Sequence, residues 1–198
     1  MKVLIAGATG KTGLRLTKEL KSRGHHPIAL VRESSDTAVL PSDVELRHGD
    51  LTNLQDGACD GCDAVIFAAG SGGDTGPEMT DKVDRDGAKR LVDLAAKAKV
   101  ARFVMLSSVG ADNPDPESEL AHYLQAKHEA DEHLKASGLN YAIVRPVRLT
   151  DEDGTRDIVL GDDVDVEGKA ARGDVAAVLA DALDSGKWSC KAMSMQSL

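Results

Sequence analysis

The sequence predicts an α/β fold with a doubly wound parallel sheet, the Rossmann fold, and three observations carry this prediction. Apolar, strand-like runs alternate with helix-like segments along almost the whole chain. A glycine-rich turn directly follows the first strand-like run and opens the first helical segment. The chain has 198 residues, of which 41% are hydrophobic and 29% charged, so it is large enough for a domain with a full core.

Strand-like and helix-like segments take turns in a regular order. Apolar runs bounded by turn residues predict six strands, over residues 2–7, 26–32, 43–51, 63–70, 101–108 and 139–146. Apolar spacing of three and four residues predicts helices over residues 11–24, 86–99, 117–138 and 171–186. Right-handed crossovers between such strands bring the strand ends to one edge of a parallel sheet, where ligands bind.

Two loop-like segments, 71–81 and 110–119, each follow a strand, so both should border the ligand crevice. The alternating pattern weakens from residue 147 onward. We therefore expect a single domain over residues 1–198, in which residues 147–198 form a small extension on the substrate side.

The net charge and the cysteine count limit the binding partners and the cellular compartment that we expect for the protein. A net charge of −9 argues against nucleic-acid partners and against docking on anionic membranes. The apolar run Val3–Ala6 is too short for a signal peptide, and no stretch is long enough to span a bilayer. Three cysteines without a secretion signal fit a reducing cytoplasm. We expect a cytoplasmic monomer or homodimer that acts on a small molecule.

The stretch AGATGKTG, residues 6–13, is compatible with two phosphate-binding designs. A nucleotide-hydrolase loop ending in Gly10-Lys11-Thr12 would need its first glycine at position 5, where Ile5 stands in mid-strand. The comb Gly7, Gly10 and Gly13 fits a dinucleotide site better. Its glycines would permit the sharp turn, the approach of a pyrophosphate to the helix N-terminus, and close packing of helix against strand.

Six motifs occur in the order of the short-chain dehydrogenase/reductase superfamily: GATGKTG, GDL, VIFAAG, FVMLSSVGA, HYLQAK and YAIVRP. The chain most resembles the small atypical NAD(P)-binding members of that superfamily, often described as NAD-dependent epimerase/dehydratase-like. The resemblance covers residues 1 to about 184. It implies a bound dinucleotide and a set of cofactor-binding residues: Gly7, Thr9, Gly10, Lys11, Thr12, Gly13, Arg32, Asp50, Leu51, Ala68, Ala69, Gly70, Ser107, Lys127 and Pro146.

The residue that ends the second strand helps to distinguish NADP from NAD. An acid in that place accepts hydrogen bonds from the ribose 2′-hydroxyl, whereas an arginine meets the 2′-phosphate of NADP. Arg32 stands there, and Lys11 in the glycine loop is expected to reach the same phosphate. Glu33, the next residue, is an acid and therefore favours NAD. We expect NADP, with NAD as the alternative.

The resemblance also assigns roles at other strand ends. It places Asp50 and Leu51 along the adenine, and residues 68–70 against the adenosine ribose. It brings Pro146 toward the nicotinamide. The residue after this proline is often glycine in the family, and here it is Val147, which departs from the family pattern.

Tyr123 and Lys127 are the main catalytic candidates. They are spaced i, i+4 in one predicted helix and so share a face. A nearby ammonium favours the phenolate form of a tyrosine, which could then relay a proton while hydride moves. A serine at the end of the fifth strand should position the substrate oxygen. Only one of Ser107 and Ser108 can face the crevice, and ungapped matching to the family favours Ser108.

Other residue types that often bind metals are interpreted as structural. Cys59 and Cys62 have no second cysteine pair to complete a zinc site, so no metal is expected. His122 is next to Tyr123 in sequence, but on a helix it points about 100° away, so we expect it at the surface.

The sequence therefore predicts an NADP-dependent oxidoreductase that transfers hydride to or from a small carbonyl or alcohol, with Ser108, Tyr123 and Lys127 as catalytic residues. One alternative is a non-catalytic NAD(P)-binding redox sensor, although such relatives tend to lack the tyrosine and the lysine. Another is a sugar-nucleotide epimerase or dehydratase, which normally needs a larger C-terminal substrate domain.

Overall fold

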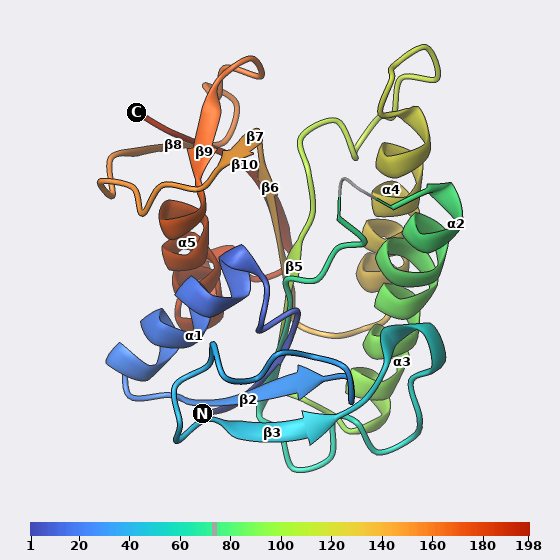
Figure 1. The fold of residues 1–198 in the computed structure, drawn as a ribbon. Helices are drawn as coiled ribbons and strands as arrows, with labels where there is room; N and C mark the ends of the chain where they lie inside the picture. Colours follow the sequence, from blue (N-terminus) through green and yellow to red (C-terminus); the bar gives the residue numbers. More distant parts are fainter. Residues whose placement is uncertain (73–74) are drawn as a thin grey trace.

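A computed structural model describes residues 1–72 and 75–198, and it confirms the doubly wound α/β fold (Figure 1). Seven strands run parallel in the main sheet: β1 (Lys2–Ala6), β2 (His26–Val31), β3 (Glu45–His48), β4 (Ala64–Phe67), β5 (Arg102–Leu106), β6 (Tyr141–Pro146) and β10 (Lys191–Ser197). The sheet continues beyond β10 with short strands: β7 (Arg148–Thr150), β8 (Ile158–Leu160) and β9 (Lys169–Ala171).

Helices cover both faces of the sheet. On one face lie α1 (Lys11–Ser22) and α5 (Arg172–Asp184), and on the other lie α3 (Ala88–Lys97) and α4 (Ala121–Ala136) (Figure 1). The remaining helical segments are short: η1 (Leu51–Asn53), α2 (Pro77–Thr80), η2 (Asp81–Gly87) and η3 (Gly186–Trp188). No helix in the described part of the chain is both long and apolar enough to cross a membrane.

Side-chain alternation along the strands builds the two cores. In β1, Val3 and Ile5 pack toward α1 and α5, whereas Leu4 and Ala6 pack toward α3 and α4. Both sets are fully buried, as expected for a central strand covered on both faces. The same alternation recurs in β5, where Phe103 and Met105 face the α3–α4 layer.

The strand order determines where a ligand can bind. The order is β3-β2-β1-β4-β5-β6-β10, so the chain reverses direction of winding between β1 and β4. In open α/β sheets the crevice lies beyond the carboxyl ends of the strands at this switch point. The glycine-rich turn after β1 and the segment after β4 therefore flank the expected site.

The helix predicted over residues 86–99 begins earlier than expected. Continuous helical structure starts with α2 at Pro77 and passes through the π-helical segment η2 into α3. Proline is favoured at the first helical position, because its missing N–H would have no partner there. Segment 71–81 was therefore wrongly predicted as loop from Pro77 onward, and residues 73 and 74 lie outside the described part. The helix predicted over 117–138 begins later, at Ala121.

The C-terminal part differs from the predicted substrate-side extension. Helix α5 packs against α1, and β10 pairs with β6 in parallel, so much of residues 147–198 completes the sheet and its core. Only β7, β8 and β9 and their connections lie at the rim. Strand β10 reads KAMSMQS and is mostly half-buried, so it lacks the apolar run by which the other strands were predicted.

Cys59 and Cys62 pack in the core on the α3 side of the sheet. Burial raises the pKa of the Cys59 thiol to about 12, and it also raises the pKa of Cys62. Within residues 1–72 and 75–198, no three His, Cys, Asp or Glu side chains gather closely enough to hold a metal ion. That these cysteines are structural stays a prediction.

Candidate active site

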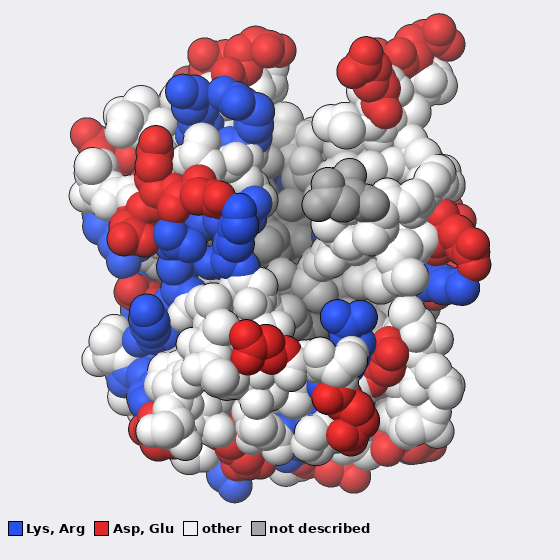
Figure 2. Space-filling model, in the orientation of Figure 1, with Lys and Arg blue, Asp and Glu red and all other residues white. Residues whose placement is uncertain are grey.

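A cleft with two adjoining pockets lies along the carboxyl edge of the sheet, and Figure 2 shows it as a hollow between two lobes. The larger pocket has a volume of about 640 Å³ and the smaller about 390 Å³. They meet at Gly10 and at residues 68–71, where the turn after β1 and the end of β4 lie opposite each other. The cleft is therefore long enough to bind an extended ligand across both pockets.

The glycine comb has the geometry that a phosphate-binding turn needs. Gly7 has a φ of +87°, and a Cβ at this position would lie 2.6 Å from the backbone of Ala69. A Cβ on Gly13 would lie 2.0 Å from the Gly7 carbonyl oxygen, so this glycine lets α1 pack against the turn. Gly10 caps α1 without a side-chain hydrogen bond from any described residue. The first N–H groups of α1 are thus available to an anion.

The smaller pocket contains the residues expected around the adenosine. Arg32 is exposed at its edge, and Asp50 and Leu51 follow it along the wall. Asp50 Oδ1 accepts hydrogen bonds from the backbone N–H and the hydroxyl of Thr52, and the backbone bond is the main reason that the pKa of Asp50 is lowered. Glu33, which counted against NADP, pairs with His48 on β3 at 3.2 Å.

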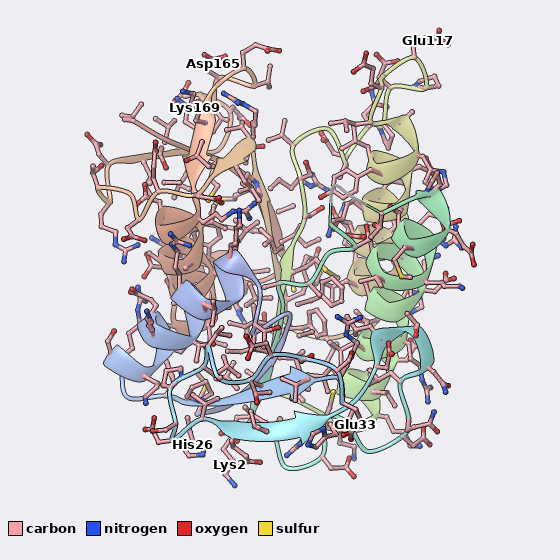
Figure 3. All side chains as sticks on the ribbon, viewed as in Figure 1. Lys2, His26, Glu33, Glu117, Asp165 and Lys169 are labelled. Atoms are coloured by element: carbon pink, nitrogen blue, oxygen red, sulfur yellow. The ribbon has the colours of Figure 1, made fainter. Side chains whose placement is uncertain are left out.

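Lys11 lines a different pocket from Arg32, whereas the prediction was that both reach one phosphate. It lines the larger pocket and pairs with Asp151, because α1 begins beside the segment that follows β7. Arg172, at the start of α5, lies in the same place: it donates to Thr12 Oγ1 at 3.1 Å and to Asp151 Oδ1 at 2.8 Å. In Figure 2 basic side chains gather on this wall of the cleft, while Figure 3 shows Glu117 and Asp165 at the tips on either side of its mouth.

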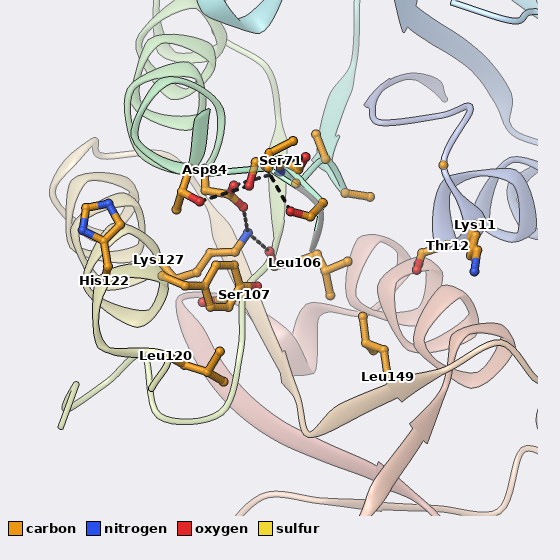
Figure 4. A pocket seen from close by; sticks show the side chains of 18 of the residues that line it. Lys11, Thr12, Ser71, Asp84, Leu106, Ser107, Leu120, His122, Lys127 and Leu149 are labelled. Atoms are coloured by element: carbon orange, nitrogen blue, oxygen red, sulfur yellow. Dashed lines mark hydrogen bonds and ion pairs between the residues drawn. The ribbon is translucent and has the colours of Figure 1, made fainter. Parts of the chain in front are cut away.

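Tyr123 and Lys127 line one end of the larger pocket, as their helical spacing predicted. Lys127 Nζ lies 5.7 Å from the centre of the Tyr123 ring and 5.6 Å from that of Phe67. It donates to the Leu106 carbonyl oxygen at 3.2 Å and forms an ion pair of 3.1 Å with Asp84 (Figure 4). His122 is exposed at the surface, as predicted, and it also lines this pocket and pairs with Asp81 at 2.9 Å.

The serine that lines the cleft is Ser107, and not Ser108 as the matching favoured. Alternate residues of a strand point to the same face, so Ser107 lies on the same face as Phe103 and Met105. That face packs against the α4 layer, where Tyr123 and Lys127 lie. Its hydroxyl donates to Asp131 at 2.9 Å. The Ser108 hydroxyl donates instead to the carbonyl of Val109, its neighbour in the chain.

Pro146 is buried at the end of β6, and it is not one of the described residues that line the two pockets. The next residue, Val147, donates its backbone N–H to Met195, which ties the end of β6 to β10. Leu149 on β7 lines the larger pocket instead. Gly13 also lies behind the wall, in the packing role described above. The other predicted cofactor residues all line one pocket or both.

Buried charged residues that the sequence did not indicate support the catalytic candidates. Asp131 is fully buried and accepts from Ser107 and from Arg145, whose Nη2 lies 2.9 Å away. Burial raises the pKa of Asp131, against the opposing effect of Arg145. The spacing Lys127 to Asp131 is i, i+4, which was a usable signal for Asp131. Asp84 and Arg172 gave no such signal, because tertiary packing alone brings them to the cleft.

The fold and the cleft together define an NAD(P)-binding protein of the Rossmann class. The crevice lies at the topological switch point, with a glycine turn and an open helix N-terminus at its centre. The chain belongs to the NAD(P)H-binding family, whose model matches residues 7–186.

Individual relatives match over nearly the whole chain. The protein YhfK of Bacillus subtilis (strain 168), described by its name as an uncharacterized sugar epimerase, is 40% identical over 192 residues, which cover 93% of this chain and 88% of YhfK. A Bacillus halodurans structure named for the NAD-dependent epimerases/dehydratases has a TM-score of 0.94 and 36% identity, covering 100% of this chain and 94% of that one. The oxidoreductase ylbE from Lactococcus lactis has a TM-score of 0.87 and 31% identity, covering 100% and 91%.

Proposed function

We propose that the protein is an NADP-dependent oxidoreductase that transfers hydride to or from a small carbonyl or alcohol substrate. The observation that carries this proposal is the arrangement of the cleft. Tyr123, Lys127 and Ser107 line one end of it, Arg32 stands at the other, and the open N-terminus of α1 lies between them. This order matches the order of the chemical groups in an NADP molecule.

The residues present fit such a cofactor. The space at Gly7 and Gly13 would be filled by any Cβ, which fits a turn that must stay thin for a pyrophosphate. Lys11, Thr12 and Arg172 surround the N-terminus of α1 with donors for the same anion. When bound, NADP would supply the hydride acceptor or, in its reduced form, the hydride donor.

Tyr123 is the group that would move a proton at the substrate oxygen. Its half-buried hydroxyl-bearing ring faces the pocket, and the Lys127 ammonium stabilises negative charge beside it. The Ser107 hydroxyl donates its hydrogen bond to Asp131. Its oxygen can therefore still accept a hydrogen bond from a molecule in the cleft. Ser107 would thus orient a hydroxyl group, either of an alcohol or of Tyr123.

The substrate end of the cleft favours a small molecule. Leu106, Leu120 and Leu149 line it together with Pro77. Most of residues 147–198 completes the sheet through α5 and β10, which leaves only the short strands β7, β8 and β9 on the substrate side. This arrangement supports a small substrate over a sugar nucleotide, despite the epimerase names of two relatives.

Arg32→Ala is expected to weaken the binding of NADPH by roughly ten- to a hundredfold and to leave NADH binding nearly unchanged. A charge-assisted hydrogen bond to phosphate is worth about 1.5–3 kcal/mol, and NADH has no 2′-phosphate. Calorimetric titration with both cofactors at one fixed ionic strength measures the effect. Arg148→Ala, at an exposed arginine on β7, is the control for a change in net charge. Equal affinity of the unmodified protein for NADPH and NADH would contradict the assignment of NADP.

A further inference from the structure

A buried carboxylate holds Lys127 at the floor of the cleft. Asp84 in η2 is fully buried and Lys127 on α4 is 3% exposed. Asp84 Oδ1 lies 3.1 Å from Lys127 Nζ, and Asp84 Oδ2 accepts the backbone N–H of Ser71 at 2.9 Å (Figure 4). Asp84 thereby connects η2, the segment after β4 and helix α4 at one point beneath the cleft.

The π-helical segment is the local structure that presents Asp84. Such wide turns are rare, and they often occur at functional sites. Within η2, Asp84 is directed inward, whereas Asp86 is exposed and pairs with Arg85 at 2.7 Å. The two acids are separated by two positions, so they form a natural pair of test and control sites on one element.

The ammonium of Lys127 has three N–H groups, and two of them have partners among the described residues. One donates to the Leu106 carbonyl and one is directed to Asp84. Both partners lie at the floor, and Lys127 itself lines the larger pocket. The third N–H is therefore the group that Lys127 can offer to a molecule bound in the cleft.

The surroundings of Lys127 decide whether it carries a charge. Burial acts to lower the pKa of this lysine, but the nearby oxygens of Tyr123 and Asp84 outweigh burial and raise it. Tyr123 and Asp131 are the titratable groups that face it from its own helix, and Asp84 faces it from η2. Its neighbours on β4 and β5, the Phe67 ring and the Leu106 carbonyl, do not titrate.

We propose that Asp84 is a positioning residue, which keeps Lys127 protonated and directs its remaining N–H toward the ribose and substrate region of the cleft. The inference rests on the proposed function, because it gives Asp84 a task in cofactor binding and turnover. Asp84 acts through Lys127, with which it forms an ion pair of 3.1 Å. Asp84 is thus the counter-ion on which the lysine of the Tyr–Lys pair depends.

The test compares Asp84→Asn with Asp86→Asn. Both changes remove one negative charge from η2 with little change in shape, but only the first leaves Lys127 buried without its counter-ion. NADPH affinity is measured by calorimetry at fixed ionic strength from about pH 7.5 to about pH 9.5. In Asp84→Asn the pKa of Lys127 falls, so its charge is lost as the pH rises, and affinity for the anionic cofactor should drop about tenfold or more across this range. Unmodified protein and Asp86→Asn should change by less than about threefold.

A second measurement keeps the test decisive if Asp84→Asn is poorly folded. An unpaired buried ammonium should lower Tm by roughly 6 °C or more, and the double variant Asp84→Asn/Lys127→Met should recover most of that loss. NADPH affinity of the double variant should stay low and independent of pH. A structural role of Asp84 alone would instead leave the stability loss in place after Lys127 is removed.

The outcomes separate this inference from the proposed function. If the unmodified protein binds neither NADPH nor NADH, the proposed function is wrong. If the unmodified protein binds NADPH, and Asp84→Asn binds it with the same affinity and pH dependence as Asp86→Asn, then Asp84 does not position Lys127 and the inference is overturned.

Discussion

Replacement of Tyr123 with phenylalanine should lower turnover roughly 10²- to 10⁴-fold and leave NADPH affinity within about twofold of the unmodified protein. The phenyl ring keeps the packing against Lys127 and removes only the hydroxyl, and a positioned acid–base group contributes about this much to a rate. The measurement is NADPH oxidation with the best substrate from a panel of aldehydes and ketones. Thermal unfolding of the variant should match that of the unmodified protein.

The chain offers a matched control for this experiment, because Tyr141 is its other tyrosine. Tyr141 begins β6, at the opposite end of that strand from the cleft. Tyr141→Phe should retain full activity. If Tyr123→Phe were as active as Tyr141→Phe, the Tyr-x-x-x-Lys pair would have no part in catalysis. A redox-sensing role would then be favoured over a catalytic one.

Gly13→Ala should destabilise the protein by about 3 kcal/mol or more and lower Tm by roughly 6–12 °C. The added Cβ would lie 2.0 Å from the Gly7 carbonyl oxygen and 2.8 Å from the Ala8 Cα, and both are backbone atoms that cannot move without shifting the phosphate-binding turn. NADPH binding should weaken together with stability, because α1 and the turn would separate. Thermal unfolding with and without NADPH measures both effects.

Gly186→Ala serves as the comparison for that substitution. A Cβ on Gly186 meets no described atom within 4 Å, so the change should alter Tm little. A Gly13→Ala protein as stable as Gly186→Ala would show that the turn after β1 is looser than the packing of Gly13 implies.

The strands, the glycine turn and the Tyr–Lys pair could be predicted because local patterns encode them. The apolar runs of β1, β4 and β5 and the spacing of Gly7, Gly10 and Gly13 need no knowledge of distant contacts. Strand β10 was missed because it is half-buried and polar, and α2 was missed because Gly76 and Pro77 are typical of loops as well as of helix starts.

The choice between Ser107 and Ser108 shows a limit of strand patterns. All five residues of β5 are buried, so the strand shows no alternation from which to tell its two faces apart. The structure distinguishes them because the α4 layer lies on the side of Phe103 and Met105. Arg172 was beyond prediction for another reason: it meets Thr12 across 160 residues of sequence, through the packing of α5 on α1.

A crystal structure of the unmodified protein with NADP⁺ tests the proposed cofactor site most directly. The 2′-phosphate should lie beside Arg32, the pyrophosphate at the N-terminus of α1 near Thr12 and Arg172, and the nicotinamide ribose within hydrogen-bond distance of Lys127 Nζ. The nicotinamide ring should lie between Tyr123 and Leu149, where a substrate oxygen can reach the tyrosine hydroxyl. A dinucleotide bound outside the two pockets, or one whose nicotinamide is directed away from Tyr123 and Lys127, would contradict the proposed oxidoreductase site.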